Sequence, residues 1–536
     1  MPKGMIVAPQ PEAVEAGALC LRRGGNAVDA AITCALVETV VDPQMCGIAG
    51  FGSMQIYLPK QGFHGCIDFH TTAPASVTPD MWQDLIEGEA RDGFGFFLKD
   101  RVNEVGYQSI MTPGSLRAFH DAVREYGSTP WRDVVEPAIE EARTGFVIRP
   151  QVYDFWMKYQ DFGRVPAADK LRYTPSGERI YFNANGTLKT PGMRIENPDM
   201  TRTLERIAEG GADVFYSGEI AEAIDADMRA NGGRLRREDL DAYRTVRTAP
   251  LWGEYRGLRL STNRPPGGGV MIVEMLNILE NFDLASMGHN TPEYIRTVAE
   301  AMKIATADKD NHVGDPEFVD VPLDQLCGKD YAASCAEMIR RGDKVHVERI
   351  DIAPESKHTT HISVLDGDGN AVSITHSLGM PSGVITDGLG FMYNGCMAVF
   401  DPRPGRAGSL APGKRRFSSM SPTMLFKGDD PYMVIGAPGG TFIAMGILQA
   451  ILNVVDFGMS MSDAIAAPRF TCNSDTIDLS NRIPRYTEQA LNQMGYPTAR
   501  SFRSYAFAGV HAILIDEDGA LHGAADPGRD GMALEG

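Results

Sequence analysis

The sequence has no long apolar run, no closely spaced pair of cysteines and no strongly basic stretch. No segment approaches the roughly 18 consecutive apolar residues of a membrane-spanning helix. Residues 1–17 lack the charged start and the apolar core of a secretory signal. The eight cysteines are scattered through the 536 residues and form no Cys-x-x-Cys pair. We therefore expect a reduced, cytoplasmic protein without a membrane partner.

The charge balance is acidic, with 70 Asp and Glu against 51 Lys and Arg and a net charge of −19. A nucleic-acid or anionic-membrane partner requires a basic surface. The longest basic cluster, Lys414, Arg415 and Arg416, is too short to form one. We therefore expect no nucleic-acid partner. The length fits either several domains or one large αβ body.

The common cofactor and nucleophile motifs are also missing. The glycines at 47–52 are in the wrong order for a dinucleotide fingerprint, and the glycine-rich segment 436–441 lacks the lysine of a phosphate loop. No Gly-x-Ser-x-Gly or His-Glu-x-x-His occurs, and the histidines show no metal spacing. The turn at 366–370 departs from a calcium loop, with Ala371 at position six and Ser377 at position twelve. It is typical of a hairpin turn, and we expect no cofactor and no metal.

Helical and strand patterns alternate in the first third, 114–250 is mainly helical, and short strands dominate after 361. Helices are predicted over 11–23, 27–41 with Asn26 as N-cap, 115–126, 217–230, 270–280, 293–310 and 440–456. Strands are predicted over 53–57, 361–365, 371–376, 432–436 and 510–515. The polar segment 348–358 is predicted to be a surface linker.

The linker ends at Thr359, Thr360 and His361, just before the 361–365 strand. β-Branched residues often open strands, which is one interpretation. A second is chemical, because a threonine hydroxyl becomes a nucleophile when its own free α-amine serves as the base. The pKa of an α-amine is about 7.7–8.0, close to working pH. A threonine within the chain gains that amine only if the peptide bond between His358 and Thr359 breaks, through an ester that water then hydrolyses.

Ordered motifs along nearly the whole chain resemble the γ-glutamyltranspeptidase family of N-terminal-nucleophile hydrolases. They lie at residues 24–30, 67–74, 231–233, 238–243, 276–283 and 314–316, and then at 359–361, 368–372, 418–423, 438–440, 467–469 and 526–527. The resemblance implies a four-layer αββα sandwich. It also implies self-cleavage into a large chain, 1–358, and a small chain, 359–536, that remain one intertwined body.

The resemblance assigns roles to matching residues. It implies that Thr359 is the nucleophile after cleavage and that Ser377, where the family has a threonine, supports it. Gly439 and Gly440 match the two backbone N–H groups of the family's oxyanion hole.

Two further positions match groups that contact the substrate. Ser418 and Ser419 correspond to hydroxyls that hold the substrate's α-carboxylate, although without the family match a polar turn would explain them.

Three positions depart from the γ-glutamyl pattern. His70 stands where those enzymes have an arginine that clamps the α-carboxylate, and Val399 stands where an Asp holds the α-amino group. Gly379 replaces an Asn two residues past the second hydroxyl. A buried ammonium without a carboxylate partner is unfavourable, and histidine lacks the fork geometry of arginine. These changes predict that the glutamyl pocket is lost while the amide-cleaving groups remain.

We therefore expect a self-processing amidohydrolase that cleaves a small amide through a Thr359 acyl-enzyme. The substrate is expected to carry a carboxylate near Ser418, Ser419 and His70, and oxamate-type amidohydrolases and β-lactam side-chain acylases are family relatives of this kind. The first alternative is a genuine γ-glutamyl transferase or glutathione hydrolase. The second is a family member that never matures and serves as a binding protein. The sequence is compatible with either hydrolysis or acyl transfer. It is also compatible with either a single processed heterodimer or a homodimer of processed heterodimers.

Overall fold

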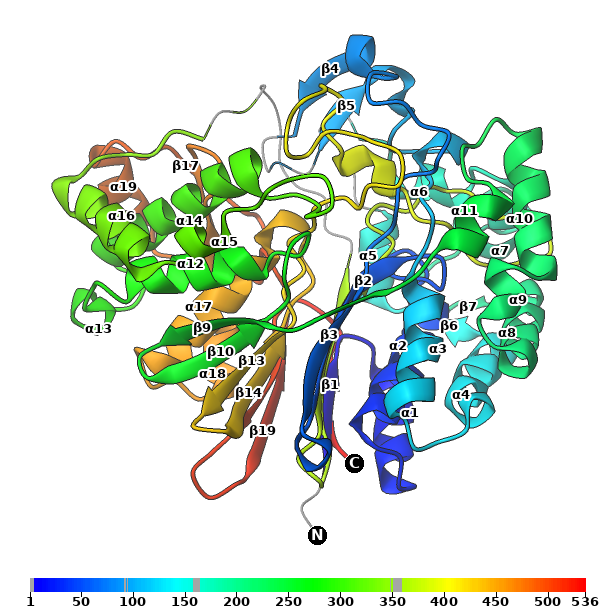
Figure 1. The fold of residues 1–536 in the computed structure, drawn as a ribbon, viewed down its shortest axis with the longest axis horizontal. Coiled ribbons are helices and arrows are strands. Elements are labelled where there is room, and N and C mark those ends of the chain that lie inside the picture. Colours follow the sequence, from blue (N-terminus) through cyan, green and yellow to red (C-terminus); the bar gives the residue numbers. More distant parts are fainter. Residues whose placement is uncertain (1–3, 91–92, 94, 158–163, 348, 350–358) are drawn as a thin grey trace.

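The computed structural model describes residues 4–90, 93, 95–157, 164–347, 349 and 359–536. Two antiparallel β-sheets face each other at its centre (Figure 1). Seven strands form the first sheet in the order β20 (Met532–Glu535), β1 (Met5–Ala8), β11 (Thr360–Leu365), β12 (Ala371–Ser377), β2 (Phe51–Leu58), β3 (Phe63–Phe69) and β8 (Val246–Thr248). Six strands form the second in the order β19 (Leu521–Ala525), β18 (His511–Ile515), β14 (Asp430–Gly436), β13 (Thr423–Lys427), β10 (Leu258–Thr262) and β9 (Leu251–Tyr255).

Helices cover the outer face of each sheet (Figure 1). The first sheet shares its core with α1 (Pro11–Arg22), α2 (Ala27–Val41), α3 (Ser115–Tyr126) and α4 (Trp131–Thr144). The same side holds α5 (Pro150–Trp156), α6 (Ala167–Leu171), α7 (Pro175–Tyr181), α8 (Pro198–Gly210), α9 (Asp213–Tyr216), α10 (Glu219–Ala230) and α11 (Arg237–Ala242).

The second sheet shares its core with α12 (Gly269–Leu279), α14 (Pro292–His312) and α17 (Ile443–Val455). Around them lie α13 (Leu284–Met287), α15 (Leu323–Leu326), α16 (Lys329–Arg341), α18 (Met461–Ala466) and α19 (Arg485–Gln493). A smaller apolar layer, which includes Val7, Leu365 and Val434, fills the space between the sheets. The predicted four-layer αββα sandwich is confirmed.

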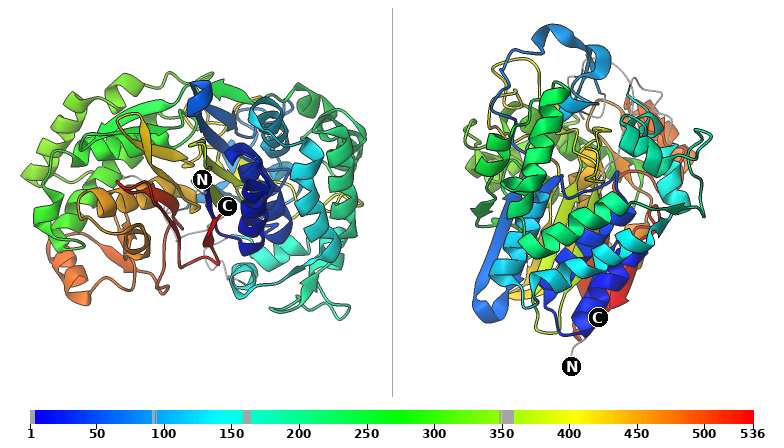
Figure 2. Two further views of the ribbon diagram at one scale, coloured as in Figure 1. Left: turned by 90° about the horizontal axis from the view of Figure 1, so that it is seen from below. Right: turned by 90° about the vertical axis from the view of Figure 1, so that its right-hand side faces the viewer.

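Three small sheets complete the fold. They are β4 (Ile86–Glu89) with β5 (Phe96–Leu98), β6 (Phe146–Val147) with β7 (Arg194–Ile195), and β15 (Phe470–Thr471) with β16 (Ile477–Leu479) and β17 (Thr498–Arg500). The hairpin of β4 and β5 stands above the ends of the central sheets (Figure 1). Strands β1 and β20, near the two ends of the chain, pair with each other (Figure 2).

Local signals explain why several predicted elements are confirmed. Asn26 caps α2 in a reciprocal capping box with Asp29. The β11–β12 hairpin turns as predicted, since the Asp366 carboxylate accepts hydrogen bonds from the backbone N–H groups of Asp368 and Asn370. The predicted strands β14 and β18 and helices α12, α14 and α17 are also present. The predicted linker lies outside the described residues, apart from Arg349.

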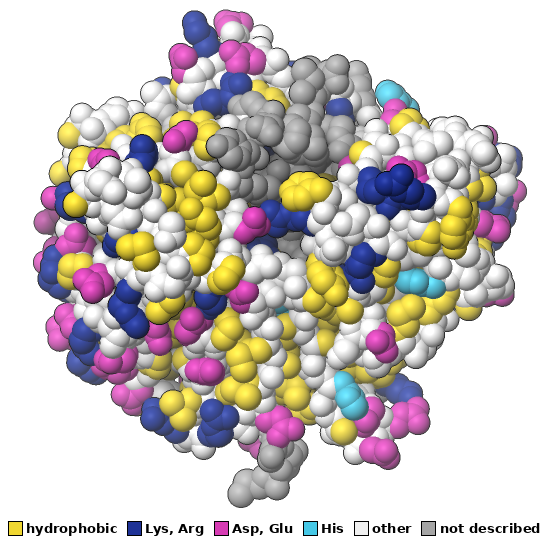
Figure 3. Space-filling view, turned by 180° about the vertical axis from the view of Figure 1, so that it is seen from behind, with side chains coloured by type: hydrophobic (Ala, Val, Ile, Leu, Met, Phe, Trp, Pro, Cys, Tyr) yellow, Lys and Arg dark blue, Asp and Glu magenta, His cyan; other side chains and the backbone are white. Residues whose placement is uncertain are grey.

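The surface in Figure 3 carries acidic side chains interspersed with basic ones. Within the part of the chain that the structure describes, no helix has the length and apolar character needed to cross a bilayer.

Candidate active site

Strand pairing brings Thr359 and Ser377 together at one end of the first sheet. Thr360 of β11 is paired with His376 of β12, so the next pair outward is Thr359 with Ser377. Side chains alternate along a strand, which places both hydroxyls on the face that looks toward the second sheet. The Thr359 Oγ1 lies 3.4 Å from the Ser377 Oγ, and both side chains are buried. Ser377 Oγ also accepts a hydrogen bond from the N–H of Gly379 at 2.8 Å.

A buried acid supports the start of β11 from the helical side. The Glu38 carboxylate of α2 accepts a hydrogen bond from Thr360 Oγ1 at 2.9 Å and lies 2.7 Å from Nε2 of His376. Burial raises the pKa of Glu38, while His376 and Thr360 oppose that rise. Because Thr360 is the first residue of β11 and directly follows Thr359, this cluster fixes the backbone next to the candidate nucleophile.

The same cluster contains atoms that could ligate a metal. Glu38, Cys46 and His376 offer ligand atoms within 4.8 Å of one another. Burial raises the pKa of the Cys46 thiol well above its usual value, which disfavours the thiolate that a metal needs. Glu38 is already hydrogen-bonded to Thr360 and His376, so the three groups fit a structural role better than a metal centre.

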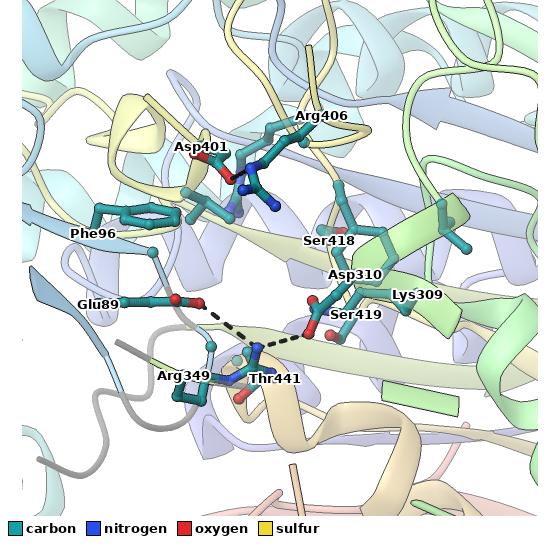
Figure 4. Close-up of a pocket in the computed structure, with 18 of the residues that line it drawn as sticks. Glu89, Phe96, Lys309, Asp310, Arg349, Asp401, Arg406, Ser418, Ser419 and Thr441 are labelled. Carbon is teal, nitrogen blue, oxygen red and sulfur yellow. Dashed lines mark hydrogen bonds and ion pairs between the residues drawn. The ribbon is translucent and has the colours of Figure 1, made fainter. Parts of the chain in front are cut away.

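Thr359 opens onto a cavity of about 390 Å³. Predicted site residues Ser418, Ser419 and Gly440 line it together with Thr359, and so does Val399. Ser418 and Ser419 project from the loop before β13, on the side of the cavity opposite Phe96 and Glu89 (Figure 4). The structure thus brings into one cavity groups that are up to 81 residues apart in sequence.

Gly439 and Gly440 form the turn between β14 and α17. Their φ angles are +148° and +57°, which favour glycine. A Cβ on Gly439 would lie 2.6 Å from Cα of Ala508, so no larger residue fits there. Neither N–H donates a hydrogen bond to any residue that the structure describes. Backbone N–H groups without a protein acceptor are the kind of donor that can bind an oxyanion, and Gly440 lines the same cavity as Thr359.

His70 lies behind Ser418 and reaches the cavity only through it. Its Nε2 is 2.8 Å from Ser418 Oγ, and its Nδ1 is 2.7 Å from Asp68 Oδ1. Asp68 is also paired with Arg415 at 3.2 Å. Burial works against ionisation of Asp68, but His70 and Arg415 lower its pKa overall. The ionised Asp68 fixes Nδ1 of His70 as a donor, which leaves Nε2 directed at the hydroxyl of Ser418.

Asp68, His70 and Ser418 are therefore connected in the order of a serine hydrolase triad. Sequence reasoning missed this chain of hydrogen bonds, because His70 and Ser418 are 348 residues apart and no local pattern connects them. The Asp-x-His spacing of the first two is the one signal available in the sequence.

Most charged groups on the cavity wall are paired with each other. Arg349 lies 2.7 Å from Asp310 and 3.6 Å from Glu89 (Figure 4). Asp401 is bound by Arg403 at 2.7 Å and by Arg406 at 3.7 Å.

The remaining wall positions carry no unpaired acid. Lys309 pairs with Asp310, and Val399 presents an apolar side chain to the cavity. Each carboxylate of the described wall thus already has a basic partner.

Gly379 occupies a crowded, left-handed turn, with φ +73°. A Cβ at this position would lie 2.7 Å from Sγ of Cys396 and 3.4 Å from Nη2 of Arg416. An asparagine, as the γ-glutamyl pattern has here, would bring its Cβ into a clash with Sγ of Cys396 and would require a left-handed backbone that favours glycine.

Sequence comparison places this site in a family. The profile described as Gamma-glutamyltranspeptidase matches residues 13–536. The chain belongs to the γ-glutamyltranspeptidase family. It is 37% identical over 538 residues to the Acylase ACY 1 proenzyme of Pseudomonas sp. (strain V22), covering 99% of this chain and 93% of that protein. It is 34% identical over 550 residues to the Glutathione hydrolase proenzyme of Escherichia coli (strain K12), covering 98% and 90%.

Solved structures agree with this membership. The cephalosporin acylase from Bacillus halodurans superimposes with a TM-score of 0.87 at 28% identity, covering 99% of this chain and 96% of that one. The γ-glutamyltranspeptidase of Helicobacter pylori matches with a TM-score of 0.55 at 29% identity, covering 64% and 92%. The chain is thus an amide-bond hydrolase of this family with the N-terminal-nucleophile fold, and the non-enzymatic alternative is set aside.

Proposed function

We propose that the chain cleaves itself before Thr359 and then hydrolyses a small carboxylate-bearing amide through a Thr359 acyl-enzyme. The observation that carries this proposal is the placement of Thr359 against Ser377 at the cavity that Ser418, Ser419 and Gly440 also line. The names of two relatives, both called proenzymes, are consistent with maturation by cleavage.

Maturation and turnover use the same hydroxyl. In maturation, Oγ1 of Thr359 attacks the carbonyl carbon of residue 358, the C–N bond breaks, and the freed nitrogen takes the hydroxyl proton. Water hydrolyses the resulting ester, which leaves a carboxylate on residue 358 and a free α-amine on Thr359. In turnover that amine accepts the hydroxyl proton while Oγ1 attacks the substrate amide.

The tetrahedral intermediate then collapses. The N–H groups of Gly439 and Gly440 hold its oxyanion, and such donors are commonly worth about 10²–10³ in turnover each. The α-amine passes the proton to the departing substrate nitrogen, and the acyl group remains as an ester on Oγ1. A water molecule gives its proton to the same amine and attacks the ester, which releases a carboxylate and restores Thr359.

The wall of the cavity favours an acyl group without an ammonium. Val399 offers no charge, and the carboxylates of Glu89, Asp310 and Asp401 already pair with basic side chains. An α-ammonium would therefore enter without a free partner, which is costly in a buried site. The pairing of these wall carboxylates therefore favours an acyl group without an α-ammonium over the γ-glutamyl group of glutathione.

Two measurements test the proposal. Mass spectrometry and N-terminal sequencing of the purified protein should find a fragment that begins at Thr359. A panel of small amides should leave an acyl adduct on that fragment. Persistent full-length chain in an active preparation would refute the mechanism, and γ-glutamyl-anilide turnover equal to that of the glutathione hydrolases would refute the substrate assignment.

The Asp68, His70 and Ser418 chain supports a second candidate, in which Ser418 is the nucleophile of the uncleaved protein. The 2.8 Å and 2.7 Å contacts are within the range of a working triad. Thr359→Ala separates the two, because it should abolish turnover in the first mechanism and leave it in the second.

A further inference from the structure

Arg416 differs from every other basic residue on the described wall of the cavity. It lies in the loop before β13, two residues from Ser418, and the residue is 3% exposed. The guanidinium stacks over the ring of Phe51 at 4.4 Å and faces the cavity. Among the described residues, no carboxylate forms an ion pair with it, and its Nε has no hydrogen-bond partner.

The other cations serve as the comparison. Arg349, Arg403, Arg406 and Lys309 each have a carboxylate partner on the same wall. Their charges are therefore neutralised within the protein, whereas the charge of Arg416 is not.

The immediate neighbours of Arg416 cannot balance its charge. The Cys396 thiol lies beside it, and burial raises the pKa of that thiol, so it remains neutral near pH 7. Phe51 contributes only a cation–π contact. Arginine keeps its proton in proteins even where burial lowers its pKa, as it does here. A buried, permanent positive charge that faces a cavity is stabilised by an anionic group that enters the cavity.

The location of this charge connects it to the reaction. A Cβ on Gly379 would lie 3.4 Å from Nη2 of Arg416, and the N–H of Gly379 donates to Ser377, the partner of Thr359. Glycine at 379 thus leaves room for the guanidinium next to the predicted nucleophile.

We propose that Arg416 binds the carboxylate of the substrate's acyl group. The inference rests on the proposed function for the reaction, and it adds the residue that selects the acyl group. Guanidinium pairs with carboxylate through two parallel hydrogen bonds, which gives both affinity and orientation. The substrate class is therefore the monoamides of short aliphatic dicarboxylic acids, in which one carboxyl forms the scissile amide and the other is ionised.

The test compares charged and neutral substrates. The substrates are the monoanilides of the dicarboxylic acids from malonic to adipic, with their methyl esters as neutral isosteres. Each is assayed with the wild type and with the variants Arg416→Gln, Arg416→Lys and Arg406→Gln. Arg416→Gln should lower the ratio of kcat/KM for acid over ester by about 30-fold or more, and Arg416→Lys should restore part of it. Arg406→Gln is the matched control, because it removes a paired charge from the same wall, and its ratio should stay within about twofold of wild type.

Binding separates failure of this inference from failure of the proposed function. Calorimetry of the processed protein with the free dicarboxylates, and with the corresponding diamides, requires no turnover. Tight dicarboxylate binding that Arg416→Gln weakens would support the inference even if no amide were cleaved. An unchanged acid-to-ester ratio together with unchanged dicarboxylate binding in Arg416→Gln would overturn it, as would an equal loss on acids and esters, which would indicate a structural role.

Discussion

Replacing Ser377 by alanine tests whether the second hydroxyl positions the nucleophile. The substitution removes the 3.4 Å contact with Oγ1 of Thr359 and leaves the buried N–H of Gly379 without its 2.8 Å acceptor. An unsatisfied buried N–H costs about 1–3 kcal/mol, and the long hydroxyl contact adds about 0.5 kcal/mol. The fold should therefore survive. Turnover should fall by about 100-fold, because a small misplacement of a reacting group has an effect of this order.

Ser373→Ala is the matched control for that experiment. Ser373 is an equally buried hydroxyl on the same face of β12, and it donates to the carbonyl of Ile435 at 3.2 Å. Both variants should lose comparable stability in a denaturant titration, but only Ser377→Ala should lose kcat and mature slowly by gel electrophoresis. Ser377→Thr keeps the hydroxyl and should remain within about threefold of wild type. Equal rates for Ser377→Ala and Ser373→Ala would refute the positioning role.

Three further predictions concern the nucleophile and the buried acid–base groups. Thr359→Ala should remain full-length on a denaturing gel and release no amine from any amide, whereas Ser418→Ala should still be cleaved; the opposite pattern would favour the serine mechanism. Burial lowers the pKa of His511 from 6.5 to about 3, so the unfolded chain binds more protons in that range and stability should fall as the pH drops from 6.5 toward 3. His511→Leu should flatten this dependence, seen as a smaller decrease in Tm across the range, and an unchanged slope would remove His511 as its cause. Glu38→Leu should remove the buried acceptor of His376 and Thr360 and lower the free energy of unfolding by about 3–5 kcal/mol, measured by denaturant titration; a loss below about 1 kcal/mol would show that the pair contributes little.

Elements with local signals could be predicted from the sequence. Helix α2 has a capping residue and a capping box, and the β11–β12 hairpin has a turn rich in Gly, Asp and Asn. Strands such as β1, β3 and β10 were not anticipated. In β1, which has four residues, every side chain is buried, so the alternation that marks a half-exposed strand is missing.

The basic cluster shows why part of the site could not be predicted. In sequence, Lys414, Arg415 and Arg416 form a short positive run. In the structure, Lys414 donates to two backbone carbonyls, Arg415 pairs with Asp315, and only Arg416 faces the cavity. The function of each residue depends on the direction of its side chain, which is set by the packing of distant segments.

The strand order of the two central sheets has a consequence for how the enzyme could be produced. In the first sheet, β1 lies between β20 and β11, and β12 lies next to β2; in the second, β10 lies next to β13. Residues before and after Thr359 thus contribute strands to both sheets, and neither part holds a complete one. Two separately synthesised polypeptides would each present unpaired strand edges, which promote aggregation. A recombinant source should therefore supply one continuous gene, and two-plasmid expression of the parts should yield mostly insoluble material.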